Sequence, residues 1–192
     1  MKTLSTRRQV LRQASSLLAL PLFAMPHTSQ SAPAPALPSE LQALLPQARL
    51  IGSAVLRFFG LRVYEARLWA NADFLPERCA RQPIALELRY ERKLDGTAIA
   101  ERSIAEMRRI GAFNEEKARQ WLELMTRAFP DVVPEDRLLG WSDGKGEVRF
   151  FHNTRLTASI QDPEFARLFF GIWLAPESSA PALRKSLLGL AG

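Results

Sequence analysis

Cysteine and histidine, which supply many nucleophiles and metal ligands in proteins, are scarce in this chain. Its 192 residues include one cysteine, Cys79, and two histidines, of which His27 lies in a leader-like segment. A single cysteine cannot form an intramolecular disulfide, and we expect Cys79 to pack as a small apolar side chain. His152 follows two phenylalanines at the end of an expected strand, where we expect a structural rather than a catalytic imidazole. These residues are too few for a His/Cys metal site, and no clustered acids indicate a carboxylate site, so we predict no metal.

The basic character of the chain is concentrated at its N-terminus. The formal net charge is +6 and the sequence pI is about 10.1. Residues 1–31 hold four of the 26 basic residues and no acid, which leaves 22 basic and 20 acidic residues in the remainder. Because the body is close to balanced, we expect no nucleic acid as partner.

Residues 1–31 are typical of a cleavable export signal. A basic stretch precedes an apolar run over residues 14–25, which is too short to span a bilayer stably. The segment Thr6-Arg7-Arg8-Gln9-Val10-Leu11-Arg12 resembles a twin-arginine motif, with Val where Phe is usual, so the general secretory route stays open. An N-terminal core helix is the alternative, but it would contain Pro21. We therefore predict a periplasmic protein without a stable membrane span after cleavage, which falls between Ala24 and Ala32.

The chain then divides into a linker and one domain. Residues 32–44 are predicted to form a proline-rich spacer and a short helix that begins near Ser39. Residues 45–190 are predicted to form a single domain of ordinary size, in which no internal repeat is evident. The sequence leaves the oligomeric state open.

The stretch from Gly52 to Asn71 is predicted to be the first β segment of this domain. Residues 64, 66, 68 and 70 form a mostly apolar row, and residues 63, 65, 67 and 69 form a mixed row that we expect to face outward. Gly60 interrupts the pattern, so the stretch is predicted to be two short strands or one long strand with a bend or bulge at the glycine.

The elements after this stretch predict an α+β domain. Apolar alternation predicts a strand over residues 84–91, a hairpin of residues 137–141 and 147–153, and a strand over 156–160. Helical spacing and capping residues predict helices over residues 97–109, from Asn114 to Pro130, from Asp162 to Pro176 and over 181–188. Strands and helices in separate runs favour an antiparallel sheet that carries helices on one face.

The order and spacing of several motifs point to a known family. They are Gly52, Phe58-Phe59-Gly60-Leu61-Arg62-Val63-Tyr64, the Leu94-Asp95-Gly96 turn, Asp162-Pro163-Glu164-Phe165, Phe170-Gly171-Ile172-Trp173-Leu174 and Pro181-Ala182-Leu183-Arg184. In this order they resemble the exported bacterial branch of the chalcone isomerase-like family, over about residues 45–190. The resemblance implies an open-faced β sandwich, in which an antiparallel sheet packs against helices with an apolar ligand cleft between the layers.

The resemblance also implies what the site has lost. Enzymes of this family close a flavanone ring without a cofactor, through an arginine, a tyrosine and other donors that stabilise developing negative charge. A threonine of their motif falls on Phe59, and their Tyr-x-x-Lys-x-x-x-Asn pattern falls on Ile99, Arg102 and Glu106. Only the cation is kept, so ring closure is not expected; Arg49 is the candidate match for the family's anion-steering arginine.

Three functions follow from this pattern. Fold relatives in the family bind fatty acids through an arginine and a tyrosine, so the first hypothesis is a non-catalytic periplasmic binder of an apolar or fatty-acid-like amphipathic molecule. Its expected contacts are Arg102, Arg57 and Tyr64, with Phe59 and Ile99 as apolar lining, although Arg102 could instead pair with Glu106 and Tyr64 could be a core residue. The second hypothesis is an isomerase or intramolecular lyase with a rearranged site. The third is a structural or partner-binding protein whose cleft is filled by its own side chains.

Overall fold

The computed structural model describes residues 35–190. The predicted export signal and the first part of the predicted linker lie outside these residues. Within the rest of the linker, the short helix α1 spans Leu41–Leu44 and begins after Glu40, with no side-chain cap. The expected cap at Ser39 is therefore wrong by one residue.

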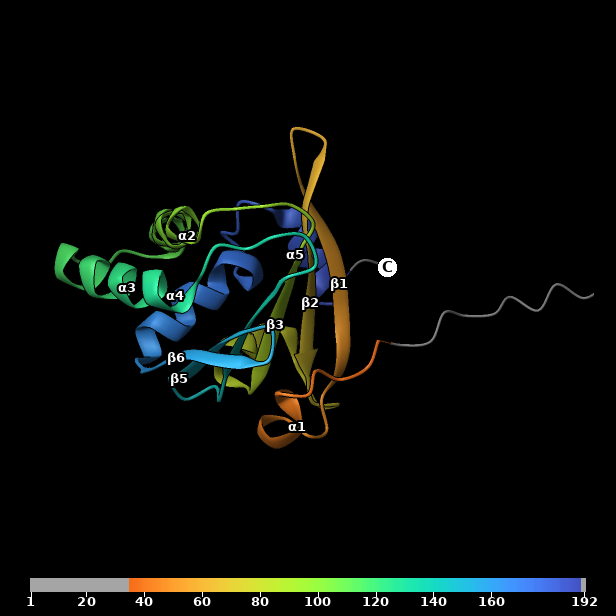
Figure 1. Ribbon diagram of the computed structural model, residues 1–192. Helices are drawn as coiled ribbons and strands as arrows, with labels where there is room; N and C mark the ends of the chain where they lie inside the picture. Colours follow the sequence, from red (N-terminus) through yellow and green to blue (C-terminus); the bar gives the residue numbers. More distant parts are fainter. Residues whose placement is uncertain (1–34, 191–192) are drawn as a thin grey trace, which may run out of the picture. The chain divides into compact units, whose positions relative to one another are not determined.

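Six antiparallel strands form one sheet, and every strand pairs with its neighbour in the sequence (Figure 1). The strands are β1 Arg49–Phe58, β2 Leu61–Ala70, β3 Ile84–Tyr90, β4 Arg137–Ser142, β5 Glu147–His152 and β6 Arg155–Gln161. Period-two alternation in the sequence produces two distinct faces of this sheet.

The first β segment is a long hairpin. β1 and β2 are ten residues each and are joined by a tight turn at Phe59 and Gly60, whose φ angles are 48° and 78°. Two successive positive φ values are the hallmark of the two-residue turn that matches the twist of a β hairpin. Gly60 therefore reverses the chain between two strands. The alternative of two strands is confirmed, and the alternative of one long strand with a bend or bulge is wrong.

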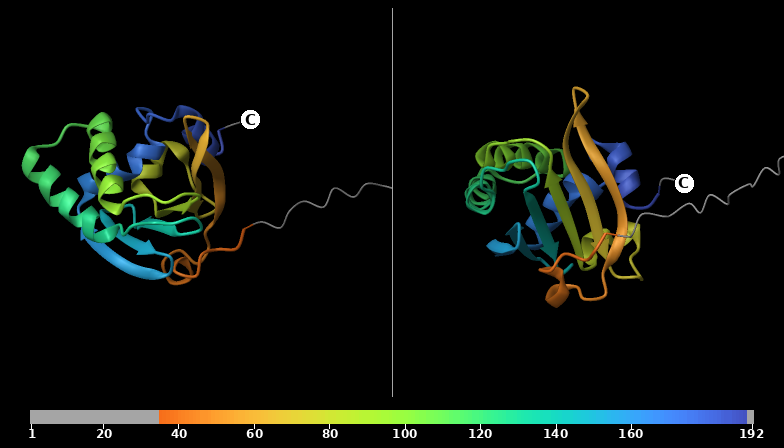
Figure 2. Two further views of the ribbon diagram at one scale, coloured as in Figure 1. Left: turned by 45° about the horizontal axis from the view of Figure 1, so that its top comes forward. Right: turned by 45° about the vertical axis from the view of Figure 1, so that its right-hand side comes forward.

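Four helices cover one face of the sheet (Figure 2). They are α2 Gly96–Ile110, α3 Glu115–Ala128, α4 Pro163–Leu174 and α5 Pro181–Leu187. The side chains of Asp95, Asn114 and Asp162 cap α2, α3 and α4 by accepting backbone N–H bonds, and a 3-10 turn, η1, spans Pro76–Arg81. None of these described helices is long and apolar enough to cross a membrane.

The other face of the sheet carries a smaller core under α1. Trp69 is buried there against Leu41 and Leu45, and its Nε1 donates a hydrogen bond to Glu87 Oε2 over 2.9 Å. The end of the mixed row on β2 is therefore covered, and the expectation that Trp69 faces outward is wrong. An alternating row cannot reveal that a distant segment folds over it.

Gly52 allows α5 to pack directly on β1. A Cβ at this position would lie 2.1 Å from the carbonyl oxygen of Ser186 and 2.6 Å from that of Leu187. Since backbone atoms cannot rotate away, we expect Gly52→Ala to lower the free energy of unfolding by about 3 kcal/mol in urea denaturation. Ser53→Ala, on the exposed neighbour, is the control and should change it by less than about 0.5 kcal/mol. Equal stability of the two variants would contradict the close packing.

Candidate functional site

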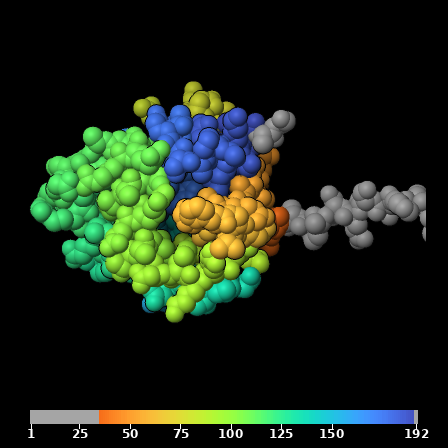
Figure 3. Space-filling view, turned by 90° about the horizontal axis from the view of Figure 1, so that it is seen from above, coloured from red at the N-terminus to blue at the C-terminus, as the bar shows by residue number. Residues whose placement is uncertain are grey.

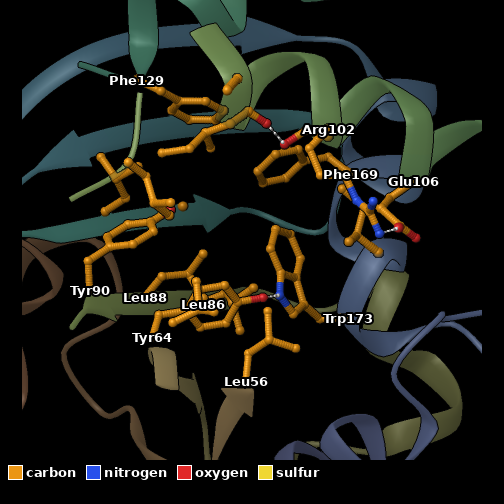
Figure 4. A pocket seen from close by; sticks show the side chains of 18 of the residues that line it. Leu56, Tyr64, Leu86, Leu88, Tyr90, Arg102, Glu106, Phe129, Phe169 and Trp173 are labelled. Carbon is orange, nitrogen blue, oxygen red and sulfur yellow. Dashed lines mark hydrogen bonds and ion pairs between the residues drawn. The ribbon is translucent and has the colours of Figure 1, made fainter. Parts of the chain in front are cut away.

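A cavity of about 540 Å³ lies between the sheet and the helical layer. This volume is typical of sites for small molecules. Figure 4 shows that its walls are mostly apolar and aromatic side chains. The sheet contributes Leu56, Tyr64, Leu86, Leu88, Tyr90, Leu138 and Phe150, and the helices and their connections contribute Leu94, Ala98, Ile99, Phe129, Phe169, Ile172 and Trp173.

The strand register brings the lining residues of the sheet together on one face. Tyr64 on β2 pairs with Leu56 on β1 and with Tyr90 on β3, so the three side chains lie on the same face. Leu86 and Leu88 continue that face along β3. The same alternation that predicted the strands therefore places their apolar rows along the cavity.

The cavity opens at the end of the molecule where the β1–β2 hairpin turns. Seen from above, a hollow lies between α2, the hairpin and the segment that leads into α5 (Figure 3). The exposed lining residues at this end are Arg57 and Phe58 from the hairpin, Asp95 at the N-cap of α2, Ala98 and Arg102 from α2, and Ser179 before α5. The mouth is therefore polar, while the interior is apolar.

Tyr64 is the best-defined polar group inside the cavity. Its hydroxyl accepts a hydrogen bond from Trp173 Nε1 over 2.9 Å, which leaves the phenol proton available to a ligand. Burial raises the pKa of Tyr64 to about 12, against the smaller opposing effect of the Trp173 hydrogen bond. Burial also raises the pKa of Tyr90, whose ring meets that of Tyr64 edge to face. Both phenols are neutral donors at physiological pH and not bases.

Arg102 lies at the mouth and is already paired. Its guanidinium contacts the Glu106 carboxylate one helical turn away, and its side chain is 71% exposed. Glu106 is buried beside it and also lies 3.6 Å from Arg109. The alternative that Arg102 pairs with Glu106 one helical turn away is therefore confirmed, and the cation that Arg102 brings to the cavity lining is not free of a carboxylate.

The comparisons with known proteins agree on the fold. Residues 36–189 match the model of a family described as chalcone isomerase-like. The chain belongs to the chalcone isomerase-like family. An uncharacterized protein of Haemophilus influenzae is 30% identical over 139 residues, which are 72% of this chain and 67% of its own length. A crystal structure of a fatty-acid binding protein from Arabidopsis thaliana has a TM-score of 0.56 and 14% identity, and the match covers 76% of this chain and 88% of that one.

Four of the five ligand contacts predicted from the chalcone isomerase-like resemblance line the cavity. Arg57, Tyr64, Ile99 and Arg102 all line the cavity. Phe59 does not, because it occupies the hairpin turn and is 89% exposed. The prediction that Phe59 lines the pocket is wrong, and its neighbour Phe58 lines it instead.

Arg49 lies away from this site. It pairs with Ala70 at the far end of β1, and its guanidinium donates to the carbonyl of Ala72 over 3.0 Å. Nothing in this arrangement lets Arg49 steer an anion into the cavity.

Sequence reasoning missed Tyr90, Trp173 and Phe129 as lining residues. Tyr90 continues the apolar row of β3 and was visible as its last member, and Trp173 stands in a motif already singled out for the family. Their roles depend on partners far away in the sequence, since Trp173 donates to a tyrosine 109 positions earlier. No local pattern signals such a pair.

The histidine and the cysteine of the domain lie outside the lining of this cavity. His152 Nε2 is 3.6 Å from Asp136 Oδ2, and burial raises the pKa of the partly exposed Cys79 thiol. A second hollow of about 690 Å³ lies between η1, α4 and α5, with charged side chains such as Arg78 and Arg167 around it. No group of three or more metal-ligating side chains occurs among residues 35–190. The apolar cavity with its few polar groups is therefore the candidate site.

The raised pKa of Tyr64 makes stability depend on pH. Its pKa is about 12 in the folded protein, against about 10 in an unfolded chain. The corresponding stabilisation is complete below pH 10 and is lost as the pH rises towards 12. We expect the free energy of unfolding to fall in this range, and Tyr64→Phe to remove part of the fall. An unchanged pH dependence in Tyr64→Phe would contradict the burial of this phenol, and Tyr90→Phe provides the parallel measurement on the other tyrosine.

Proposed function

We propose that this protein binds an apolar or fatty-acid-like amphipathic molecule without transforming it. The observation that carries the proposal is the cavity of about 540 Å³, apolar inside and polar at one open end. Such a shape suits a ligand with a hydrocarbon body and one polar group, because the body leaves water while the polar group remains hydrated or hydrogen-bonded. The shared fold of a fatty-acid binding protein supports this assignment.

The charges predict how an amphipathic ligand lies in the cavity. Tyr64 and Tyr90 are neutral, so the interior offers hydrogen bonds but no compensating charge for a carboxylate. Arg57 at the mouth donates only to the Gly60 carbonyl, over 3.3 Å, and forms no ion pair with the described residues. Because an unpaired buried carboxylate is costly, we expect a fatty acid to enter tail first and to keep its head near Arg57.

An isomerase or intramolecular lyase is the second candidate. The observation in its favour is Tyr64, whose oxygen is held by Trp173 so that its proton can polarise a bound carbonyl. Against it, Ile99 and Glu106 replace donors of the family's enzymes, and the nearby cation is paired with Glu106. The third candidate, a partner-binding protein with a filled cleft, is at odds with the open cavity.

We further propose that the protein acts in the periplasm, as the leader-like segment predicts. Cell fractionation of the full-length gene product tests this location: recovery with cytoplasmic markers, without N-terminal processing, would refute it. Native mass spectrometry of the same material tests whether an apolar molecule co-purifies.

A bulky residue at the mouth should block binding. Ala98 is exposed on α2 and borders the cavity, whereas Ala105 is exposed on the same helix away from it. We expect Ala98→Trp to weaken binding of a fluorescent fatty acid at least tenfold, and the matched control Ala105→Trp to leave it unchanged. Fluorescence titration measures both, and equal affinities in the two variants would exclude this cavity as the binding site.

Removing the acid at the mouth should favour anionic ligands. Glu106→Gln abolishes a negative charge and frees Arg102, so we expect oleate to bind about three to ten times more tightly and oleyl alcohol to bind as before. Glu101→Gln, exposed on the same helix and outside the cavity lining, is the control. Isothermal titration with both ligands decides the matter, and unchanged oleate affinity would show that the carboxylate lies elsewhere.

A further inference from the structure

The turn of the β1–β2 hairpin is an exposed apolar tip. Residues 57–62, here called the hairpin tip, are all exposed, and Phe58, Phe59 and Leu61 are 61%, 89% and 54% exposed. The tip projects beyond the rest of the domain (Figure 1). Three large apolar side chains together at one protruding turn form an exposed hydrophobic patch, which is typical of an interaction site.

Phe59 also adopts a strained backbone conformation. Its φ of 48° lies in the left-handed region, where a bulky residue is disfavoured by about 1–3 kcal/mol and where Asn or Gly is usual in such a turn. Within the domain, its ring meets only one aromatic partner among the described residues, the exposed Phe58 at 4.5 Å. The fold therefore gains little from a phenylalanine at this position, which indicates a role outside the fold.

The charged residues of the hairpin tip itself are both basic. Arg57 and Arg62 flank the three apolar side chains, and no acidic residue occurs from Ala54 to Tyr64. Arg62 pairs with Glu91, the residue that follows β3, while Arg57 has no carboxylate partner among the described residues. Arginine beside exposed aromatic and aliphatic side chains matches the layered chemistry of a bilayer surface, with phosphates above hydrocarbon.

We propose that the hairpin tip docks the protein onto an anionic lipid bilayer. Phe58, Phe59 and Leu61 enter the boundary between headgroups and acyl chains, and Arg57 contacts lipid phosphates. A lipid surface suits the tip better than a protein does. A stable protein interface covers about 800 Å² on each partner, whereas this tip is a narrow projection built on a two-residue turn.

Docking in this way brings the mouth of the cavity to the lipid. Arg57 and Phe58 belong both to the tip and to the cavity lining, and Figure 3 shows the hairpin beside the hollow. An amphipathic molecule can then pass between bilayer and cavity with little exposure to water. This transfer rests on the proposed function, whereas the docking itself does not.

Vesicle flotation tests the docking. The sample is protein purified from cells that express the full-length gene, with any N-terminal processing that the cell carries out. We expect binding to vesicles of phosphatidylcholine with one-third phosphatidylglycerol, weaker binding to phosphatidylcholine alone, and a decrease with salt. Phe59→Asn should reduce binding at least fivefold and raise the melting temperature, because Asn tolerates the positive φ. Leu156→Asn, which alters an exposed apolar residue on β6, is the matched control and should bind as the unmodified protein does.

Three results would overturn the proposal. The first is that the protein floats with neither kind of vesicle, and the second is that Phe59→Asn binds vesicles as well as the unmodified protein does. The third is that light scattering finds the unmodified protein as a dimer and Phe59→Asn as a monomer, which would make the tip a contact between copies. The proposed function is tested separately with oleate delivered from cyclodextrin. Phe59→Asn should bind this oleate normally and take up oleate from vesicles at least fivefold more slowly.

Discussion

The spacing between sheet and helices, on which the site depends, is held by a cluster of aromatic rings. Phe150 on β5 meets Phe129 after α3 and Phe169 on α4 edge to face, with centroids 5.1 and 5.0 Å apart. Phe169 stacks on Phe165 and also touches Trp173. These rigid rings fill the space between the layers on one side and form the inner wall of the cavity on the other. The site is thus a region that the core leaves unfilled.

Much of the fold could be predicted because local chemistry determines it. Period-two rows located β3, β4, β5 and β6 and the segment that forms β1 and β2, and Asn114 and Asp162 marked two helix starts that the structure confirms. The turn at Phe59 and Gly60 was harder, because a phenylalanine at positive φ contradicts the usual turn chemistry. The local rule failed where the sequence departs from what folding alone favours.

The site was less predictable, for a different reason. Helical spacing allowed Arg102 either to enter the cavity or to pair with Glu106, and only the folded structure, in which α2 packs against α3 and α4, decides between them. Similarly, the hydrogen bond between Trp173 and Tyr64 joins α4 to β2, and the burial of Trp69 depends on α1. Alternation specifies which face of an element is buried, but not which element covers it.

The order of elements along the chain has a consequence for synthesis. The sheet is a meander of sequential neighbours, whereas α4 and α5, which complete the cavity wall and fasten β1, are the last described elements. A nascent chain can therefore pair all the described strands before α4 and α5 cover their part of the apolar face. Until α4 and α5, residues 163–187, have left the ribosome, that uncovered face is a natural substrate for chaperones, and a polypeptide that stops before them is prone to aggregate.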